Sequence, residues 1–460
     1  MTAALHMYVA PILVALAQSN EPAMALINIR LPEERVSFRE AVLRGLGSGQ
    51  GLYFFDSISK IADVEGLLAM ESLGRNVAIL GHLIGDEIPA GRLRAMIASA
   101  FDFPVPCVDV TPQVRALELF HGPSLAFKDF GARFMARCLS EFRADDSGGE
   151  MTILTATSGD TGAAVAHAYH GQPGIRAVIL YPRGRISPLQ EKLFCTLGGN
   201  VTTLSVDADF DACQRLVKQA FDDEALRSGL GLNSANSINI ARLIAQVTYY
   251  FEAAASAIRG MGDAEGRRVL RNLVFCVPSG NFGNLTAGLL ARAIGLPYKR
   301  AIAATNANDT VPRFLAAGNW DPRPTQTTLT NAMDISQPNN FPRVLELGGR
   351  HGLNLKELLS AASVSDETTR DALRDLHRMG YLADPHSALA WSALNRGLST
   401  DETGVFLCTA HPAKFLEVIR EALGLEVPLP PALAAARNKP VLSRTIGDDY
   451  SEFREVLLAL

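Results

Sequence analysis

The chain has 460 residues, of which 48% are hydrophobic and 20% charged, and its formal net charge is −5. At about 100–200 residues per domain, a globular chain of this length holds two to four structural units. The lack of a basic excess argues against a nucleic-acid or anionic-membrane surface. Any anion that binds must therefore be held by local geometry.

The first residues raise the question of a targeting segment. Tyr8 to Ala17 is apolar, as in a secretory signal, but no Lys or Arg precedes it and Pro11 interrupts it. We therefore expect residues 1–23 to be an extension, with translation starting at Met1 or Met24. No run of about 18 apolar residues occurs, so no membrane-spanning helix is expected.

A mainly helical segment is expected over residues 24–102. Ala25 to Arg30 reads as a first strand, and Arg35 to Leu46 has apolar residues at helical spacing. From residue 103 to about 430, short β-branched runs alternate with helical stretches, which predicts a separate unit. Residues 431–460 are then a C-terminal tail.

Strand-like runs in this second unit lead directly into loops and helices. The runs are Met151–Ala156, Gly174–Pro182, Leu273–Val277 and Val405–Cys408. The helices expected after three of them are 163–170, 285–294 and 413–423. Near-continuous apolar strands alternating with helices predict an α/β fold with parallel sheets covered on both faces. Ligands of such sheets bind beyond the carboxyl ends of the strands.

Cysteine usage points to a reducing compartment. No two cysteines form a Cys-x-x-Cys pair, and two of them lie in apolar, strand-like runs. The six are Cys107, Cys138, Cys195, Cys213, Cys276 and Cys408. This pattern is typical of small buried side chains rather than disulfides or metal ligands. We expect a cytoplasmic protein without a bound metal.

The loop from Gly280 to Asn284 follows a strand and opens a helix. Its two glycines, Gly280 and Gly283, allow a tight turn and a close approach to a ligand. The free amides and positive dipole end of the helix favour a bound phosphate. A tight turn without a ligand explains the glycines equally well.

Lys128 stands at the start of a largely apolar helical stretch. Phe127, Phe130 and Phe134 recur there at helical spacing. A desolvated lysine has a lowered pKa and reacts with carbonyl groups. The alternative is a lysine that reaches water or pairs with Asp129. Together, a lysine for an aldehyde and a helix amino end for a phosphate suit pyridoxal phosphate.

Five motifs resemble the threonine synthase family, in the family's order. The resemblance extends from about Ile27 nearly to the end of the chain. The motifs are His121–Asp129, Thr157–Gly162, Asn233–Asn239, Val277–Gly283 and Thr409–Phe415. The resemblance implies the two-lobed, tryptophan-synthase-β-like fold. In this fold, a smaller lobe is expected at about 150–235 and an added N-terminal domain at 24–102.

The resemblance also implies site residues. Lys128 is the residue that binds the cofactor aldehyde and then acts as a base. Thr409 matches the position that hydrogen-bonds the pyridine nitrogen. The residues implied to hold the cofactor phosphate are Gly280, Asn281, Phe282, Gly283 and Asn284. Those implied to receive the substrate carboxylate are Ser158, Gly159, Asp160 and Thr161.

The substrate phosphate needs a second anion site. Arg242 is our preferred candidate because it follows a specific motif and because an arginine side chain can bind phosphate in a bidentate manner. The polar run that precedes it supplies Asn236, Ser237 and Asn239. The weaker candidates are Arg183, Arg185 and Lys192. Each basic residue taken alone is more typical of a solvated surface charge. His121 and His411 flank the site-forming loops, where we expect structural roles.

The implied reaction converts O-phosphohomoserine and water into threonine and phosphate. The expected partners are this small-molecule substrate and, at most, a second copy of the chain, as a monomer or homodimer. A related pyridoxal phosphate ammonia-lyase or phospholyase is the first alternative. A catalytically silent homologue is the second, against which the retained Lys128 and both anion loops argue.

Overall fold

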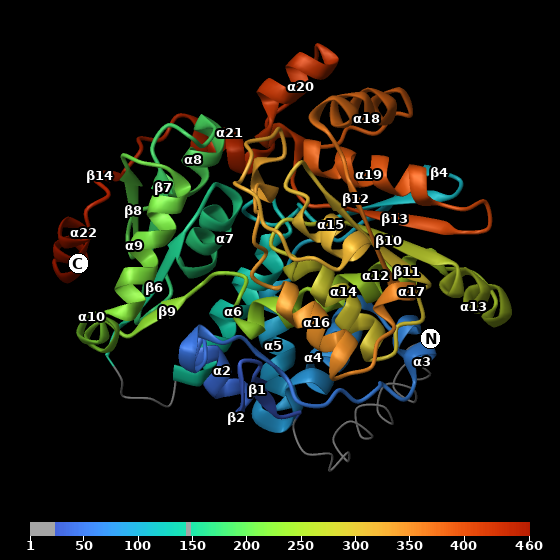
Figure 1. Cartoon of the computed structure of the whole chain (residues 1–460), viewed down its shortest axis with the longest axis horizontal. Coiled ribbons are helices and arrows are strands. Elements are labelled where there is room, and N and C mark those ends of the chain that lie inside the picture. Colours follow the sequence, from blue (N-terminus) through green and yellow to red (C-terminus); the bar gives the residue numbers. More distant parts are fainter. Residues whose placement is uncertain (1–23, 144–148) are drawn as a thin grey trace.

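The computed structural model describes residues 24–143 and 149–460. The expected extension at 1–23 lies outside the described residues. The N-terminal region forms a small antiparallel sheet in the order β2-β1-β3, surrounded by helices (Figure 1). Its elements are β1 Leu26–Asn28, β2 Leu31–Val36, α2 Phe38–Arg44, β3 Tyr53–Phe55, α3 Val64–Ala69, α4 Ser72–Ile84 and α5 Ala90–Ala100.

A six-stranded sheet has the order β12-β11-β10-β13-β5-β4. All its neighbours pair in parallel except β4 and β5. Its strands are β4 Cys107–Thr111, β5 Val114–Glu118, β10 Leu273–Pro278, β11 Arg300–Thr305, β12 Leu359–Ser363 and β13 Thr403–Cys408. The helices α12 Val247–Ala257, α13 Asp263–Arg271, α14 Gly283–Ala293, α15 Thr310–Ala317, α16 Phe341–Gly349, α17 Leu355–Leu358, α18 Asp366–Arg378, α19 Pro385–Gly397 and α20 Leu416–Leu423 accompany it.

A five-stranded, fully parallel sheet lies beside it, in the order β14-β8-β7-β6-β9 (Figure 1). Its strands are β6 Met151–Ala156, β7 Ile175–Pro182, β8 Val201–Val206, β9 Leu232–Ser234 and β14 Arg444–Ile446. The helices α6 Lys128–Arg143, α7 Asp160–Tyr169, α8 Pro188–Cys195, α9 Phe210–Asp222, α10 Glu224–Gly229, α11 Ile240–Ala245, α21 Pro431–Arg437 and α22 Tyr450–Leu458 complete the chain. The predicted α/β class with parallel sheets is thus confirmed.

Apolar packing explains the layers. One core cluster joins the N-terminal helices to one face of each large sheet. A second cluster lies between the other face of the six-stranded sheet and α18 and α19. A third lies between the five-stranded sheet and α9 and α22. The central strands β6 and β10 are buried along their whole length, because helices cover both faces.

The direction of the strands places several loops at one edge. Parallel strands end on the same side, so the loops after β10, β11 and β13 meet there. Helix α19 packs on these three strands and leads into β13. Because it runs back along the sheet, its N-terminus lies at that same carboxyl edge.

The segment after residue 430 returns to the smaller sheet. Helix α21 packs on α8, and β14 pairs in parallel with β8 as an edge strand. Helix α22 then packs on α9. The C-terminal segment is therefore part of the packed structure.

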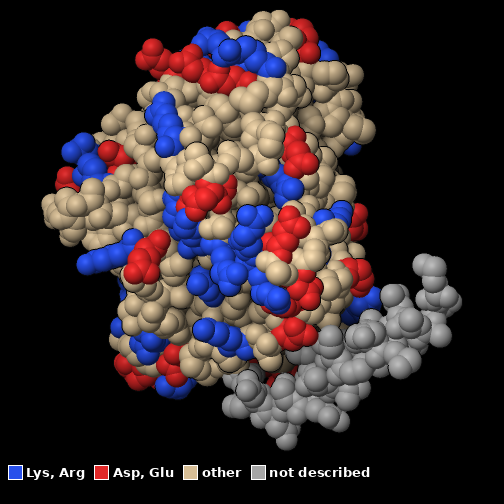
Figure 2. Space-filling model, turned by 90° about the vertical axis from the view of Figure 1, so that its right-hand side faces the viewer, with Lys and Arg blue, Asp and Glu red and all other residues tan. Residues whose placement is uncertain are grey.

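The surface mixes both signs of charge. Figure 2 shows basic and acidic side chains interspersed, with a group of Lys and Arg in the middle of this face. None of the helices in the described residues is both long and apolar enough to cross a membrane.

Candidate active site

Lys128 is the first residue of α6, where a rigid turn holds it. The Phe127 amide donates to the Thr409 carbonyl at 2.9 Å, so the start of α6 lies against the loop after β13. The Ser124 amide donates to Asp129 Oδ2 at 2.9 Å. A Cβ at Gly122 would lie 2.4 Å from the same oxygen, which explains why this turn needs glycine.

The Lys128 ammonium has no hydrogen bond or ion pair with any described residue. Burial lowers the pKa of Lys128 to about 8, and the charges of Arg242 and Lys414 act in the same direction, against Asp160. A larger fraction of this amine is therefore neutral near pH 7–8 than for an ordinary lysine. The amine is chemically suited to attack an aldehyde.

The loop after β10 forms an open anion cradle. Phe282 adopts a left-handed conformation with φ of 61°, and no side chain caps α14. Within the described residues, the amides of Gly283 and Asn284 have no acceptor. The buried Nδ2 of Asn284 also has no partner there. Unpaired donors at a helix amino end bind a phosphate group readily.

Asn284 is held in place by two tyrosines. Its Oδ1 accepts hydrogen bonds from the hydroxyls of Tyr249 at 2.6 Å and Tyr250 at 2.8 Å. The Tyr249 ring packs edge-on against Phe130, with centroids 5.2 Å apart. Phe130 lies two residues beyond Lys128, so this chain of contacts joins the lysine helix to the anion cradle.

A second loop, from Ser158 to Thr161, opens α7. The Thr157 hydroxyl oxygen accepts hydrogen bonds from the amides of Gly159 at 3.0 Å and Gly162 at 2.8 Å. Gly159 has φ of 142°, which favours glycine. The hydroxyls of Ser158 and Thr161 make no hydrogen bond with a described residue. They are free to bind a ligand.

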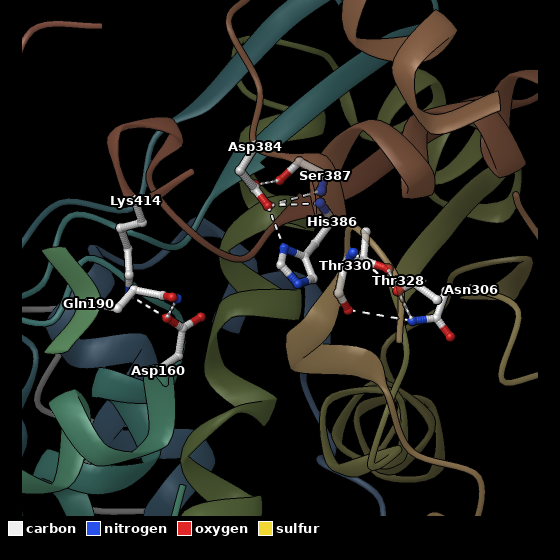
Figure 3. A network of polar contacts seen from close by, with 9 residues as sticks. All are labelled: Asp160, Gln190, Asn306, Thr328, Thr330, Asp384, His386, Ser387 and Lys414. Carbon is white, nitrogen blue, oxygen red and sulfur yellow. Dashed lines mark hydrogen bonds and ion pairs between the residues drawn. The ribbon is translucent and has the colours of Figure 1, made fainter. Parts of the chain in front are cut away.

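The Asp160 carboxylate is already paired. It lies 2.6 Å from the Lys414 ammonium and accepts a hydrogen bond from Gln190 at 3.2 Å (Figure 3). Burial alone would raise the pKa of Asp160, but Lys414 and Lys128 outweigh it and hold the pKa at about 2. Asp160 is therefore an anion at all physiological pH values, and it can offer a substrate carboxylate only its amide.

The run before Arg242 contacts the loop after β10 and the end of strand β6, which leads into the second loop. Asn281 Nδ2 donates to the Ser237 hydroxyl oxygen at 2.7 Å, and Thr155 donates to Asn236 Oδ1 at 2.6 Å. Asn239 instead caps α11 and donates to the Val42 carbonyl at 3.0 Å. The structure thus brings Asn236 and Ser237 to the site and gives the Asn239 side chain a positioning role.

Arg242 is almost fully buried, with 3% of its surface exposed. It donates to the Ala235 carbonyl, and its buried Nε has no partner within the described residues. Burial lowers the pKa of Arg242 to about 10, which still leaves it charged at neutral pH. No carboxylate pairs with it there, so an anionic ligand would compensate an otherwise costly charge.

The weaker candidates are less buried than Arg242. Arg183 and Arg185 are exposed, and Lys192 donates to the Lys439 carbonyl.

The exposed His121 pairs with Glu118 at 2.7 Å. Burial lowers the pKa of His411 to about 4, and its Nδ1 accepts the Ala413 amide at 3.1 Å. These contacts agree with structural roles for the two histidines.

Sequence reasoning missed Lys414 and His386. Lys414 is 1% exposed and donates to the Ser124 carbonyl at 2.9 Å, so it connects the loop after β13 with the lysine turn and Asp160. His386 is buried beside Asp384 (Figure 3). The motif around Lys414 was visible in the sequence, but its partner lies far away along the chain.

The described residues fit pyridoxal phosphate. An amine with a lowered pKa and an uncapped helix with an orphaned Asn284 amide group belong to one contiguous set of contacts. The Thr409 side chain is buried and makes no hydrogen bond with a described residue. An aldehyde, a phosphate and a ring nitrogen would each find a suitable group here.

Replacing Gly280 by alanine should weaken cofactor binding. The added Cβ would lie 2.7 Å from the Met333 Cα, which is backbone and cannot move aside cheaply. Overpacking of about 1–3 kcal/mol corresponds to a roughly 5- to 150-fold higher dissociation constant if it falls on the bound state. Equilibrium dialysis of pyridoxal phosphate measures this.

Gly283→Ala is the matched variant in the same loop. Its Cβ would lie 3.2 Å from Asn340 Nδ2, the end of a side chain that can adjust, so a smaller loss is expected. Equal affinities for the wild-type chain and Gly280→Ala would contradict the prediction.

Replacing Lys414 by methionine should raise the pKa of Lys128. Burial still lowers the pKa of Lys128, but the positive charge of Lys414, which also lowers it, is lost. The substitution also removes the counter-ion of Asp160, whose charge raises the pKa of Lys128. The midpoint for acetylation of Lys128 in the cofactor-free chain, followed by mass spectrometry against pH, should move from about 8 to higher pH.

Lys60→Met is the control, because Lys60 is exposed and does not influence Lys128. It should leave the acetylation midpoint unchanged. A midpoint that stays near 8 in Lys414→Met would show that Lys414 does not act on the amine.

Comparisons with known proteins agree with this site. The family model of pyridoxal-phosphate-dependent enzymes matches residues 113–409, and the C-terminal model of threonine synthase matches residues 387–456. Fold and family together define a pyridoxal-phosphate-dependent enzyme. Threonine synthase of Haemophilus influenzae is 55% identical over 95% of this chain and 100% of its own length. That of Escherichia coli is 54% identical over 95% and 99%.

Solved structures give the same result. The crystal structure of Escherichia coli threonine synthase matches with a TM-score of 0.89 at 53% identity, covering 95% of this chain and all of the other. The pyridoxal-phosphate-bound threonine synthase of Brucella melitensis matches with a TM-score of 0.86 at 32% identity, over 95% and 99% of the two chains. The chain belongs to the threonine synthase family, and its cofactor is pyridoxal phosphate.

Proposed function

We propose that the chain converts O-phosphohomoserine and water into threonine and inorganic phosphate at the site around Lys128. The observation that supports this most directly is the joining of the Lys128 amine to the uncapped end of α14 through Phe130, Tyr249 and Asn284. Full-length similarity to threonine synthases adds the reaction.

Lys128 would bind the cofactor aldehyde and then, once displaced by substrate, remove the Cα proton. Thr409 would hydrogen-bond the pyridine nitrogen. The loop Gly280, Asn281, Phe282, Gly283 and Asn284 would hold the cofactor phosphate through its backbone amides. When bound, the cofactor accepts the electron pair left on the substrate carbon.

The substrate would bind at both of its anionic ends. The amides of Asp160 and Thr161, with the hydroxyls of Ser158 and Thr161, would bind the carboxylate at the start of α7. Arg242, with Asn236 and Ser237, would bind the phosphate, because Arg242 is buried without a carboxylate partner among the described residues.

Four proton movements, at three substrate carbons, follow from the overall change. The Cα proton leaves to Lys128 and later returns, a proton leaves Cβ, and one arrives at Cγ. The Cγ–O bond breaks with its electron pair on the phosphate oxygen, and a water oxygen bonds to Cβ.

One assay tests the proposal against its competitors. The holoenzyme is incubated with O-phosphohomoserine, and threonine and inorganic phosphate are both measured; equal amounts are expected. Ammonia and a keto acid as main products would instead indicate a related lyase. No turnover with any amino acid would indicate a catalytically silent homologue.

The remaining assignments concern organisation. We propose an N-terminal domain at 24–102, a catalytic domain at 103–430 with a smaller lobe at about 150–235, and a C-terminal segment at 431–460. All six cysteines are free, which supports a cytoplasmic location. We also propose a monomer or homodimer, which sedimentation equilibrium would distinguish.

A further inference from the structure

His386 is a buried histidine whose orientation is fixed. Its side chain is 3% exposed, and Nδ1 lies 2.9 Å from Asp384 Oδ1. The opposite nitrogen, Nε2, is buried and has no partner within the described residues. The carboxylate fixes the tautomer with the proton on Nδ1, so the neutral ring presents a bare lone pair at Nε2.

The position of His386 places this nitrogen at the catalytic edge of the sheet. His386 lies in the first turn of α19, whose N-terminus is at the carboxyl ends of β10, β11 and β13. Its ring packs on Phe415, with centroids 5.1 Å apart. Phe415 follows the loop that begins at Thr409 and holds Lys414. His386 is therefore next to two elements of the proposed site.

Charged groups surround the ring. Figure 3 shows His386 below Asp384, between the Asp160–Lys414 pair and Thr330. The charge of His386 acts on both Asp160 and Asp334. Asp384, Asp160, Asp334 and Lys414 are thus the ionised groups that face it.

The proposed reaction requires a group that carries a proton. A phosphate that leaves the substrate needs one proton to become hydrogen phosphate, and the water that adds to Cβ releases one. A single imidazole can do both when it enters the cycle protonated on both nitrogens: it gives its Nε2 proton to the departing oxygen as the Cγ–O bond breaks, and the lone pair left on Nε2 then takes one from water as the new C–O bond forms. No further co-reactant is needed, because the two steps balance.

We propose that His386, oriented by Asp384, is the acid and base that carries this proton between the leaving phosphate and the attacking water. This inference rests on the proposed function. In the competing, purely structural role, Asp384 only caps α19, since it also accepts the amides of His386 at 2.9 Å and Ser387 at 3.4 Å. Those bonds do not need an imidazole.

His386→Asn separates the catalytic role from the structural one. Asn can still donate to Asp384 but has no atom at the position of Nε2, and His386→Gln serves as a second variant if the first does not fold. The kcat for threonine should fall by roughly 10²–10⁴-fold, the usual effect of a lost acid or base. The exchange of the substrate Cα hydrogen in D₂O depends on Lys128 and should persist at nearly the wild-type rate.

Further readouts and a control complete the test. The basic limb of the kcat–pH profile should disappear, because the ring must carry the proton that it donates first, and added imidazole should restore part of the activity. His351→Asn removes a half-buried histidine that contacts Phe54 and the Phe55 carbonyl, and should keep both rates. Unchanged kcat in the His386 variants, or loss of Cα exchange in parallel with kcat, would overturn the proposal. A wild-type chain that forms no threonine would instead refute the proposed function.

Discussion

Replacing Lys128 by alanine is expected to stop threonine formation. The same amine would bind the cofactor aldehyde and remove the Cα proton, so its loss removes both contributions. A missing general base alone costs roughly 10²–10⁴-fold in rate, and loss of the covalent attachment adds to this. Threonine and phosphate release would be measured, together with the visible absorbance of the lysine-bound cofactor, which should vanish.

Lys192→Met is a matched control for the loss of one lysine. Lys192 donates to the Lys439 carbonyl at the surface of the smaller sheet, so its replacement should leave both absorbance and turnover intact. A Lys128→Ala chain that retains the wild-type spectrum would place the cofactor elsewhere.

Replacing Arg242 by glutamine is expected to raise the KM for O-phosphohomoserine. A charge-assisted hydrogen bond contributes about 1.5–3 kcal/mol, which corresponds to roughly 10- to 150-fold. The structural reason is a buried guanidinium whose Nε has no partner within the described residues. Steady-state kinetics would measure KM, and the inhibition constant of inorganic phosphate should rise in parallel.

The matched control is Arg185→Gln, because Arg185 is exposed. It should leave both constants unchanged. If phosphate inhibits Arg242→Gln as strongly as the wild-type chain, Arg242 does not bind the substrate phosphate. Thermal unfolding would show whether the variant keeps its fold, since removing a buried charge also changes stability.

Strands that are buried on both faces were predictable from their residues. Met151–Ala156 coincides with β6, and the predicted run 273–277 lies within β10, because a short, continuous apolar run between turns is typical of a buried strand. The start of a helix at Lys128 was also correctly predicted. The position of the loops then followed from the rule that ligands bind at the carboxyl ends of parallel strands.

Elements stabilised by distant partners were not predictable in the same way. Strand β2 has the sequence LPEERV, which is mostly exposed and reads as a polar loop. It forms because β1 pairs with it, so the mainly helical N-terminal segment also contains a small sheet. The roles of Lys414 and His386 depend on Asp160 and Asp384 and on the packing of α19, and only the Asp384 contact is local in sequence.

The return of the C-terminal segment to β8 limits how the two large sheets can move. The chain passes between them through α6, through the stretch from β9 to β10, and again from α20 to β14. The two sheets are therefore joined by three covalent crossings. Any opening between the two sheets for substrate entry would also have to separate Lys414 from Asp160, since this ion pair joins the loop after β13 to the start of α7.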